Sequence, residues 1–208
     1  MFITSHDTPA IARHLRLIWS CLDMSREDMK SCLSQLPTGS SLLVADEDIE
    51  WLRQQAPRHN LLRRTDAGVE RLRPDGSLAE TMALYLHCLP SQIADHPARS
   101  VVALDIVLRE NTEEAWEDAE TLIHEGLPTQ IAASALIGTP QEIAQRLNDY
   151  RKLGIFDVIL MAPCARAPYR AVCETLMPLL RQQSVPLDGH ARIAGISNGP
   201  FEWHGAAL

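Results

Sequence analysis

The stretch Val101–Leu108, with the sequence VVALDIVL, decides the fold because it is almost continuously apolar. A run of this kind is typical of a strand in a parallel sheet that is covered on both faces. Phe156–Ala162, FDVILMA, repeats the pattern further along the chain. Asp105 is the charged exception within the first run. We therefore expect two buried strands, and Asp105 in the first of them needs its own explanation.

Helical patterns alternate with these strands. Helices are predicted over Thr112–Ile123, Thr139–Gly154 and about Pro168–Gln182, because each has apolar periodicity, and the first two have clear capping residues. A further strand is predicted over Ala83–Cys88. Alternation of strands and helices predicts βαβ units with right-handed crossovers and a mainly parallel sheet.

The N-terminal region has a different pattern. Asp7-Thr8-Pro9 is a good helix start, and apolar residues then recur at spacings of three and four, so an amphipathic helix is predicted over Ala10–Leu22. The segments predicted after it are a helix from Ser25 to Leu36, a strand over Ser41–Ala45, a helix over Asp46–Gln55 and a loop or weak helix over residues 58–77. We therefore expect a mostly helical region over residues 1–75, a β/α unit over 76–183 and an irregular tail over 184–208.

The chain is acidic, with a formal net charge of −8. Such a chain is repelled by phosphate backbones and anionic membranes, so neither nucleic acid nor a membrane is expected as a partner. Its densest basic cluster alternates with acidic residues, which predicts a solvated face of mixed charge. The arginines of this cluster are Arg58, Arg63, Arg64, Arg71 and Arg73.

The chain has five cysteines, an odd number, and no C-x-x-C motif. This usage argues against a disulfide framework and against a zinc site, so no metal is expected. The first residues show no basic segment followed by an apolar one, as a secretory signal requires. Reduced thiols and the lack of such a signal predict a cytoplasmic protein.

Two linked motifs resemble a known family. Ala135–Ile143 (ALIGTPQEI), followed by the Leu153-Gly154 turn, a strand and Met177-Pro178-Leu179-Leu180, is similar to the last β/α unit of the luciferase-like flavin-dependent monooxygenases. Ile106–Trp116 resembles the penultimate strand of that family and the helix after it. The resemblance covers about residues 83–182, and the most similar subgroup is the alkanesulfonate monooxygenase type.

This resemblance implies a fold and a chemistry. Family members are (β/α)8 TIM barrels that bind reduced FMN at the carboxyl ends of the strands and oxidise small organic substrates with O2. A separate flavin reductase usually supplies the reduced flavin. A complete barrel typically needs about 250 residues, so the fold predicted for this chain is α/β, a partial or truncated TIM-like barrel. Residues 76–183 would form the half-barrel.

The resemblance also locates candidate site residues. The Arg-x-His pair of the subgroup corresponds to Ala103 and Asp105, which makes Asp105 the weak catalytic candidate, with a pleat-exposed or hydrogen-bonded residue as the alternative. Gly138 and Thr139 precede a helix N-terminus, where they either contact the FMN phosphate or simply cap the helix. Arg166 follows the last strand and either binds an anionic ligand or is solvated.

Two functions follow from these observations. The first is a truncated luciferase-like oxidoreductase that acts on a small-molecule substrate, with activity impaired because alanine replaces a cation that would stabilise an anionic peroxide. The second is a non-catalytic flavin-binding or assembly protein. An open half-barrel exposes sheet edges that associate, so this alternative predicts a homo-oligomer, a dimer in the simplest case.

Overall fold

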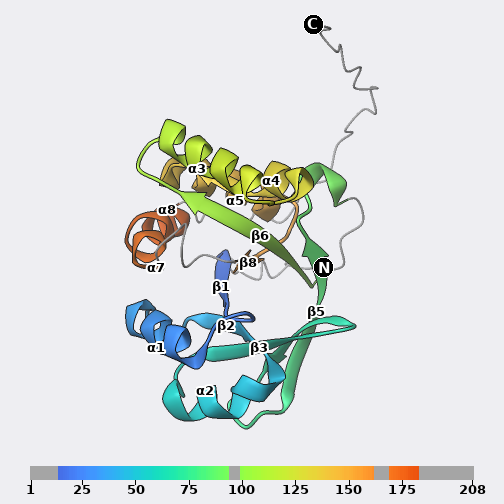
Figure 1. Cartoon of the computed structure of the whole chain (residues 1–208). Helices are drawn as coiled ribbons and strands as arrows, with labels where there is room; N and C mark the ends of the chain where they lie inside the picture. The colour runs from blue at the N-terminus through green and yellow to red at the C-terminus, as the bar shows by residue number, and fades with distance from the viewer. Residues whose placement is uncertain (1–13, 94–98, 162–168, 183–208) are drawn as a thin grey trace, which may run out of the picture. The chain divides into compact units, whose positions relative to one another are not determined.

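A closed ring of seven strands forms the centre of the computed structural model (Figure 1). The structure describes residues 14–93, 99–161 and 169–182, all of which belong to the unit Arg13–Ser184. The strands of the ring, in order, are β1 (Arg16–Ser20), β2 (Ser41–Val44), β3 (Asn60–Thr65), β4 (Gly68–Leu72), β5 (Leu78–Leu86), β6 (Ser100–Leu108) and β8 (Asp157–Met161). Pairing of β8 with β1 closes the ring.

The strand directions differ from those of a TIM barrel. Neighbouring strands of the ring are parallel except around β4, which is antiparallel to both β3 and β5. Short turns rather than helices connect β3, β4 and β5. The short strand β7 (Leu136–Gly138) pairs only with the last part of β6. The prediction of a partial or truncated (β/α)8 barrel with open edges is therefore wrong, although the chain is α/β.

The prediction of a mostly helical N-terminal region is also wrong, because this region supplies four strands of the ring. Strand β1 lies within the predicted helix Ala10–Leu22. All residues from Leu17 to Ser20 are buried, because one face of β1 meets the inside of the barrel and the other meets the outer core. A strand that is covered on both faces loses its alternating pattern, and its apolar spacing then resembles that of a helix.

The polar stretch that was expected to be a loop forms the hairpin β3–β4. Arg63 and Glu70 face each other across the two strands, and Arg63 Nη2 lies 2.7 Å from Glu70 Oε2. Charged side chains paired across strands stabilise a sheet, so they do not exclude strand structure. Gly68 adopts φ +132° in the turn, and a Cβ at this position would collide with the carbonyl of Met82.

The helices lie beside the ring, with α3, α4 and α5 grouped along β6 and with α1 and α2 beside β2 and β3 (Figure 1). The predicted helices after residue 111 are confirmed within the described residues. The helical segments are α1 (Arg26–Gln35), a 3₁₀ turn (Asp46–Asp48), α2 (Ile49–Gln55), a 3₁₀ turn (Pro90–Gln92), α3 (Thr112–His124), α4 (Thr129–Ser134), α5 (Pro140–Lys152), α7 (Tyr169–Ala171), a π-helical turn (Val172–Leu176) and α8 (Met177–Gln182). Each of these described helices is too short or too polar to cross a membrane.

The inside of the ring is packed with side chains. An apolar cluster takes at least one residue from every strand of the ring, which is the pattern of a filled barrel interior. Its members are Ile18, Leu43, Leu62, Val69, Met82, Val101, Ala103 and Ile159. A second and larger cluster fills the space between the ring and the helices.

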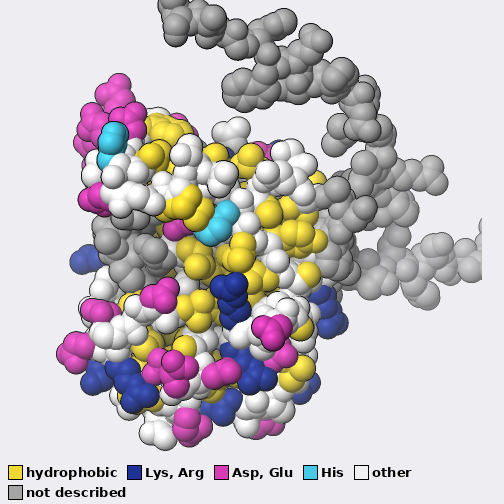
Figure 2. Space-filling view, turned by 45° about the vertical axis from the view of Figure 1, so that its right-hand side comes forward, with side chains coloured by type: hydrophobic (Ala, Val, Ile, Leu, Met, Phe, Trp, Pro, Cys, Tyr) yellow, Lys and Arg dark blue, Asp and Glu magenta, His cyan; other side chains and the backbone are white. Residues whose placement is uncertain are grey.

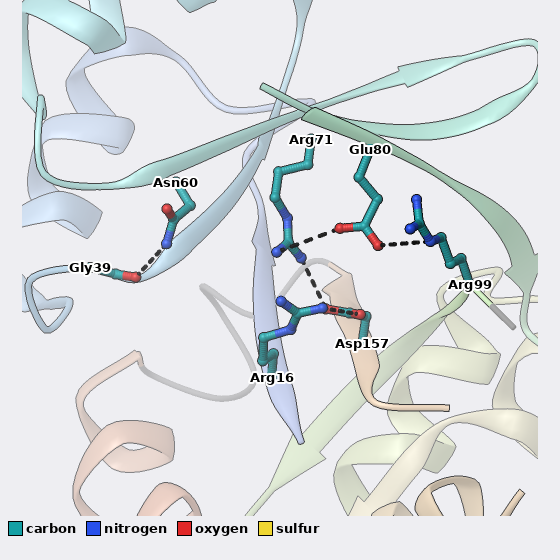
Figure 3. Close-up of polar contacts among 7 residues, drawn as sticks. All are labelled: Arg16, Gly39, Asn60, Arg71, Glu80, Arg99 and Asp157. Carbon is teal, nitrogen blue, oxygen red and sulfur yellow. Dashed lines mark hydrogen bonds and ion pairs between the residues drawn. The ribbon is translucent and has the colours of Figure 1, made fainter. Parts of the chain in front are cut away.

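A charged layer closes the amino-terminal end of the barrel. Strand alternation places its members two residues from those of the interior cluster, on the same inner face. They are Arg16, Arg71, Glu80, Arg99 and Asp157 (Figure 3). Asp157 is 5% exposed and accepts from Arg16 Nη2 at 2.7 Å and from Arg71 Nη2 at 3.3 Å.

Basic and acidic side chains are interspersed over the lower part of the face in Figure 2, where the hairpin β3–β4 and α2 lie. Arg63 belongs to this mixed-charge surface and contacts Asp46 as well as Glu70. The predicted mixed-charge face is confirmed for Arg63. Arg71 differs, because it belongs to the charged layer inside the barrel.

Candidate functional site

Asp105 lies at the carboxyl-terminal end of the barrel, where α/β proteins commonly bind ligands. Val101 and Ala103 face the interior, so Asp105 follows them on the same face of β6. It is in register with Met161, the last residue of β8. The side chain of Asp105 is 17% exposed. We call this end of the barrel, around Asp105 and Met161, the carboxyl-terminal mouth.

His87 approaches Asp105 from the neighbouring strand. It follows the last residue of β5, and its backbone N–H donates to the carbonyl of Ala103 at 2.9 Å. Its φ of 49° lies in the left-handed region, which few residues other than glycine adopt. Ring atom Nδ1 is buried and lies 3.3 Å from Asp105 Oδ2, without the alignment of a hydrogen bond. The backbone thus directs this imidazole toward the carboxylate.

Helix α5 holds the segment after His87. The hydroxyl of Tyr150, a residue that is 1% exposed, donates to the carbonyl of Cys88 at 2.8 Å. Burial raises the pKa of Tyr150 to about 12, so the hydroxyl remains a donor throughout the neutral range. The next turn is fixed as well, because the N–H of Leu89 donates to Gln92 Oε1 at 2.7 Å.

A carboxylate beside Nδ1 has a defined chemical effect on an imidazole. When the carboxylate accepts a hydrogen bond from Nδ1–H, it favours the tautomer with the proton on Nδ1, so that Nε2 is left as the proton acceptor. It also stabilises the imidazolium that forms when Nε2 takes up a proton. His87 and Asp105 are therefore the candidate acid–base pair of the described residues at this end of the barrel.

Gly138 and Thr139 lie at the same end of the barrel, with Gly138 in register with Leu108 beyond Asp105. Thr139 caps α5, and its N–H and hydroxyl both donate to Glu142 Oε2, at 2.8 and 2.9 Å. The backbone hydrogen bond from Thr139 and then the hydroxyl of Thr112 lower the pKa of Glu142. The N–H and hydroxyl donors of Thr139 are therefore already hydrogen-bonded to the Glu142 carboxylate.

These contacts do not fit a flavin phosphate at the start of α5, because a second anion there would face the charge of Glu142. The cofactor role of Gly138 and Thr139 stays a prediction. Arg166 lies outside the described residues. Among the described residues, no group of three His, Cys, Asp or Glu side chains is arranged to hold a metal ion.

Sequence reasoning found Asp105 but not its partnership with His87. The signal was present, because His87 is the penultimate residue of the predicted strand Ala83–Cys88 and the carboxyl ends of adjacent parallel strands meet at one edge. What was missing was the pairing of β5 with β6, in which Leu86 is in register with Ala103. This register brings the imidazole to the carboxylate.

No family model matches the sequence. Among solved structures, the chain is similar to the monooxygenase RslO1 from Streptomyces bottropensis, with 14% sequence identity and a TM-score of 0.34. The match covers 69% of this chain and 47% of RslO1. This chain therefore spans about half the length of RslO1. A likeness this weak carries no argument about the activity of the chain.

Proposed function

We propose that the protein binds a small organic molecule at the carboxyl-terminal mouth and that His87, oriented by Asp105, transfers a proton to or from it. This proposal rests on the distance of 3.3 Å between His87 Nδ1 and Asp105 Oδ2, which the parallel pairing of β5 and β6 brings together. General acid–base catalysis by a positioned histidine contributes about 10²–10⁴-fold to a reaction rate.

The surroundings of the pair support a chemical role. Met161, in register with Asp105, packs against the interior cluster, and Ala103 is the small residue just below Asp105 on β6. Charges interact more strongly beside apolar groups than in water. The left-handed backbone at His87 costs on the order of 1–3 kcal/mol, and such strain is concentrated at functional sites. The side chain of His87 remains 24% exposed, which leaves it within reach of a ligand.

The resemblance to flavin monooxygenases adds a class of reaction. Ala103 and Asp105 occupy the positions of the Arg-x-His pair in that family, so here an imidazole reaches the site from β5 instead of β6. Under this proposal His87 carries out the proton transfer, and Ala103 leaves the position of the cation without a charge. Oxidation of the substrate by O2, reduced FMN and a partner reductase enter the proposal through the sequence resemblance alone. Because Glu142 occupies the start of α5, we derive no step through a flavin.

The closed ring removes one of the observations behind the assembly alternative, which stays a prediction. That alternative assumed open sheet edges, but the pairings β1–β8 and β5–β6 leave the ring without a free edge. A homo-oligomer formed through some other surface stays a prediction.

The proposal is tested by NMR of the ¹⁵N-labelled protein, titrated with a panel of small phenols, alcohols, aldehydes and thiols. At least one compound is expected to shift the amide signals of Leu86, His87 and Asp105, and the shifts should disappear in the His87→Asn variant. Asparagine tolerates the left-handed backbone, so this variant removes the imidazole with little strain. His124→Gln, at the exposed end of α3, is the matched control. Binding that is retained in His87→Asn, or confined to another surface, would overturn the proposal.

A further inference from the structure

A cavity of about 580 Å³ opens at the opposite end of the barrel, beside the starts of β1, β2 and β3 and against α8. Its volume lies within the range of sites that bind small molecules, about 300–1,000 Å³. The described residues that line it are His14, Leu15, Arg16, Leu17, Trp19, Pro37, Thr38, Gly39, Ser40, Ser41, Asn60, Met177, Leu180 and Arg181. None of them belongs to the carboxyl-terminal mouth.

One wall of the cavity is apolar. Leu17 and Trp19 of β1 are 8% and 1% exposed and belong to the outer core. Met177 and Leu180 of α8 pack against the same cluster. A wall that is held in place by the core is preformed, so a ligand loses little free energy in ordering it.

The polar residues of the cavity carry positive charge. Arg16 and Arg181 are cations, His14 is a potential cation, and the described lining contains no Asp or Glu. This is notable in a chain with a net charge of −8. Arg16 contacts Asp157 through Nη2, but its side chain is still 45% exposed, and a guanidinium has further N–H donors.

The loop at the rim is held in place as well. Asn60 Nδ2 donates to the carbonyl of Gly39 at 2.9 Å, which ties the start of β3 to the loop before β2 (Figure 3). Figure 3 shows this bond on the side of Arg16 away from Glu80 and Arg99. Arg16 therefore belongs to the charged layer of the barrel and also lines the cavity.

We infer that this cavity binds an apolar carboxylate. The hydrocarbon part packs against Leu17, Trp19 and Leu180, and the carboxylate accepts hydrogen bonds from Arg16 and Arg181. Charge-assisted hydrogen bonds of guanidinium to carboxylate are among the strongest in proteins, and they give the site its preference for anions. The site is independent of the His87–Asp105 pair at the other end of the barrel.

Isothermal titration calorimetry with decanoate tests this inference, with decan-1-ol and decyltrimethylammonium as the neutral and cationic probes, each below its micelle concentration. Decanoate is expected to bind, decan-1-ol about tenfold more weakly, and the cation not at all. Arg181→Gln should raise the Kd for decanoate about tenfold. Arg170→Gln is the matched control, because Arg170 pairs with Glu174 and does not line the cavity.

A second variant guards against an indirect effect of Arg181→Gln. Thr38 is exposed at the rim, so Thr38→Asp adds a like charge without disturbing the core, and it should also weaken decanoate binding. Asp105→Asn should leave decanoate binding unchanged, because it alters the other end of the barrel. Absence of decanoate binding at about 1 mM, equal affinity for decan-1-ol, or unchanged affinity in both cavity variants would overturn the inference.

Discussion

The two ends of the barrel use carboxylates in different ways. At the amino-terminal end, Asp157 is buried between two arginines, which carry their charge at every accessible pH. At the carboxyl-terminal mouth, Asp105 faces a histidine, the side chain whose charge changes near neutral pH. The first arrangement fixes the fold, whereas the second is suited to moving a proton.

The largest expected effect concerns Asp157 at the amino-terminal end of the barrel, where the carboxylate is predicted to stabilise the fold. Asp157→Asn keeps the size of the side chain but removes the carboxylate partner of Arg16, and it leaves the mostly buried Arg71 with Glu80, 3.8 Å away. Removing one partner of a buried ion pair costs about 3–5 kcal/mol. We expect the free energy of unfolding, measured by urea denaturation, to fall by about 3 kcal/mol.

Asp149→Asn is the control for that variant, because Asp149 pairs with Lys152 on the surface. Its expected cost is below about 1 kcal/mol. Equal losses in the two variants would show that the charged layer does not stabilise the barrel.

The next effect concerns Asp105 at the carboxyl-terminal mouth, where the carboxylate is predicted to contribute little to stability. Asp105→Asn should change the free energy of unfolding by less than about 1 kcal/mol, because the side chain is partly exposed and Asn retains polar contacts. It should nevertheless weaken the proton transfer proposed for His87, because the imidazole loses the carboxylate that orients it. Ligand-induced NMR shifts and urea denaturation on the same samples separate the two effects. A stability loss as large as that of Asp157→Asn would make Asp105 a structural residue.

A smaller effect concerns the support of the mouth. Tyr150→Phe removes the hydroxyl that donates to the carbonyl of Cys88 and leaves that carbonyl without this donor. The free energy of unfolding should fall by about 1–2 kcal/mol. The amide signal of His87 should shift, since the hydrogen bond lies one residue away. An unchanged His87 signal would show that α5 does not position the imidazole.

The smallest effect concerns Glu142, the carboxylate at the start of α5, and the pH dependence of stability that it causes. The pKa of Glu142 is lowered in the folded protein, so its charge contributes stability above its ordinary value of 4.5. That contribution is lost as the pH falls from about 4.5 through the lower folded value. Denaturation at a series of pH values should show a shallower acid loss for Glu142→Gln than for the unmodified chain. Identical pH profiles would mean that the Thr139 and Thr112 contacts do not stabilise the ionised carboxylate.

Part of this molecule could be predicted from the sequence because the signals are local. Helix α5 carries its start in Thr139-Pro140 and its end in Gly154, and β6 is an apolar run with one aspartate. Strand β1 and the hairpin β3–β4 were missed because long-range pairing decides them. β1 becomes a strand through its contacts with β2 and with β8, and β8 is far from β1 along the chain. The same long-range pairing hid the partner of Asp105.

The tautomer of His87, measured by ¹⁵N NMR of the imidazole ring in the neutral state, tests the central claim most directly. The arrangement at the mouth predicts a proton on Nδ1, facing Asp105, and an unprotonated Nε2. This preference should relax in Asp105→Asn. A proton on Nε2 with Nδ1 unprotonated, or a tautomer that does not respond to Asp105→Asn, would contradict the assignment of His87 and Asp105 as an acid–base pair.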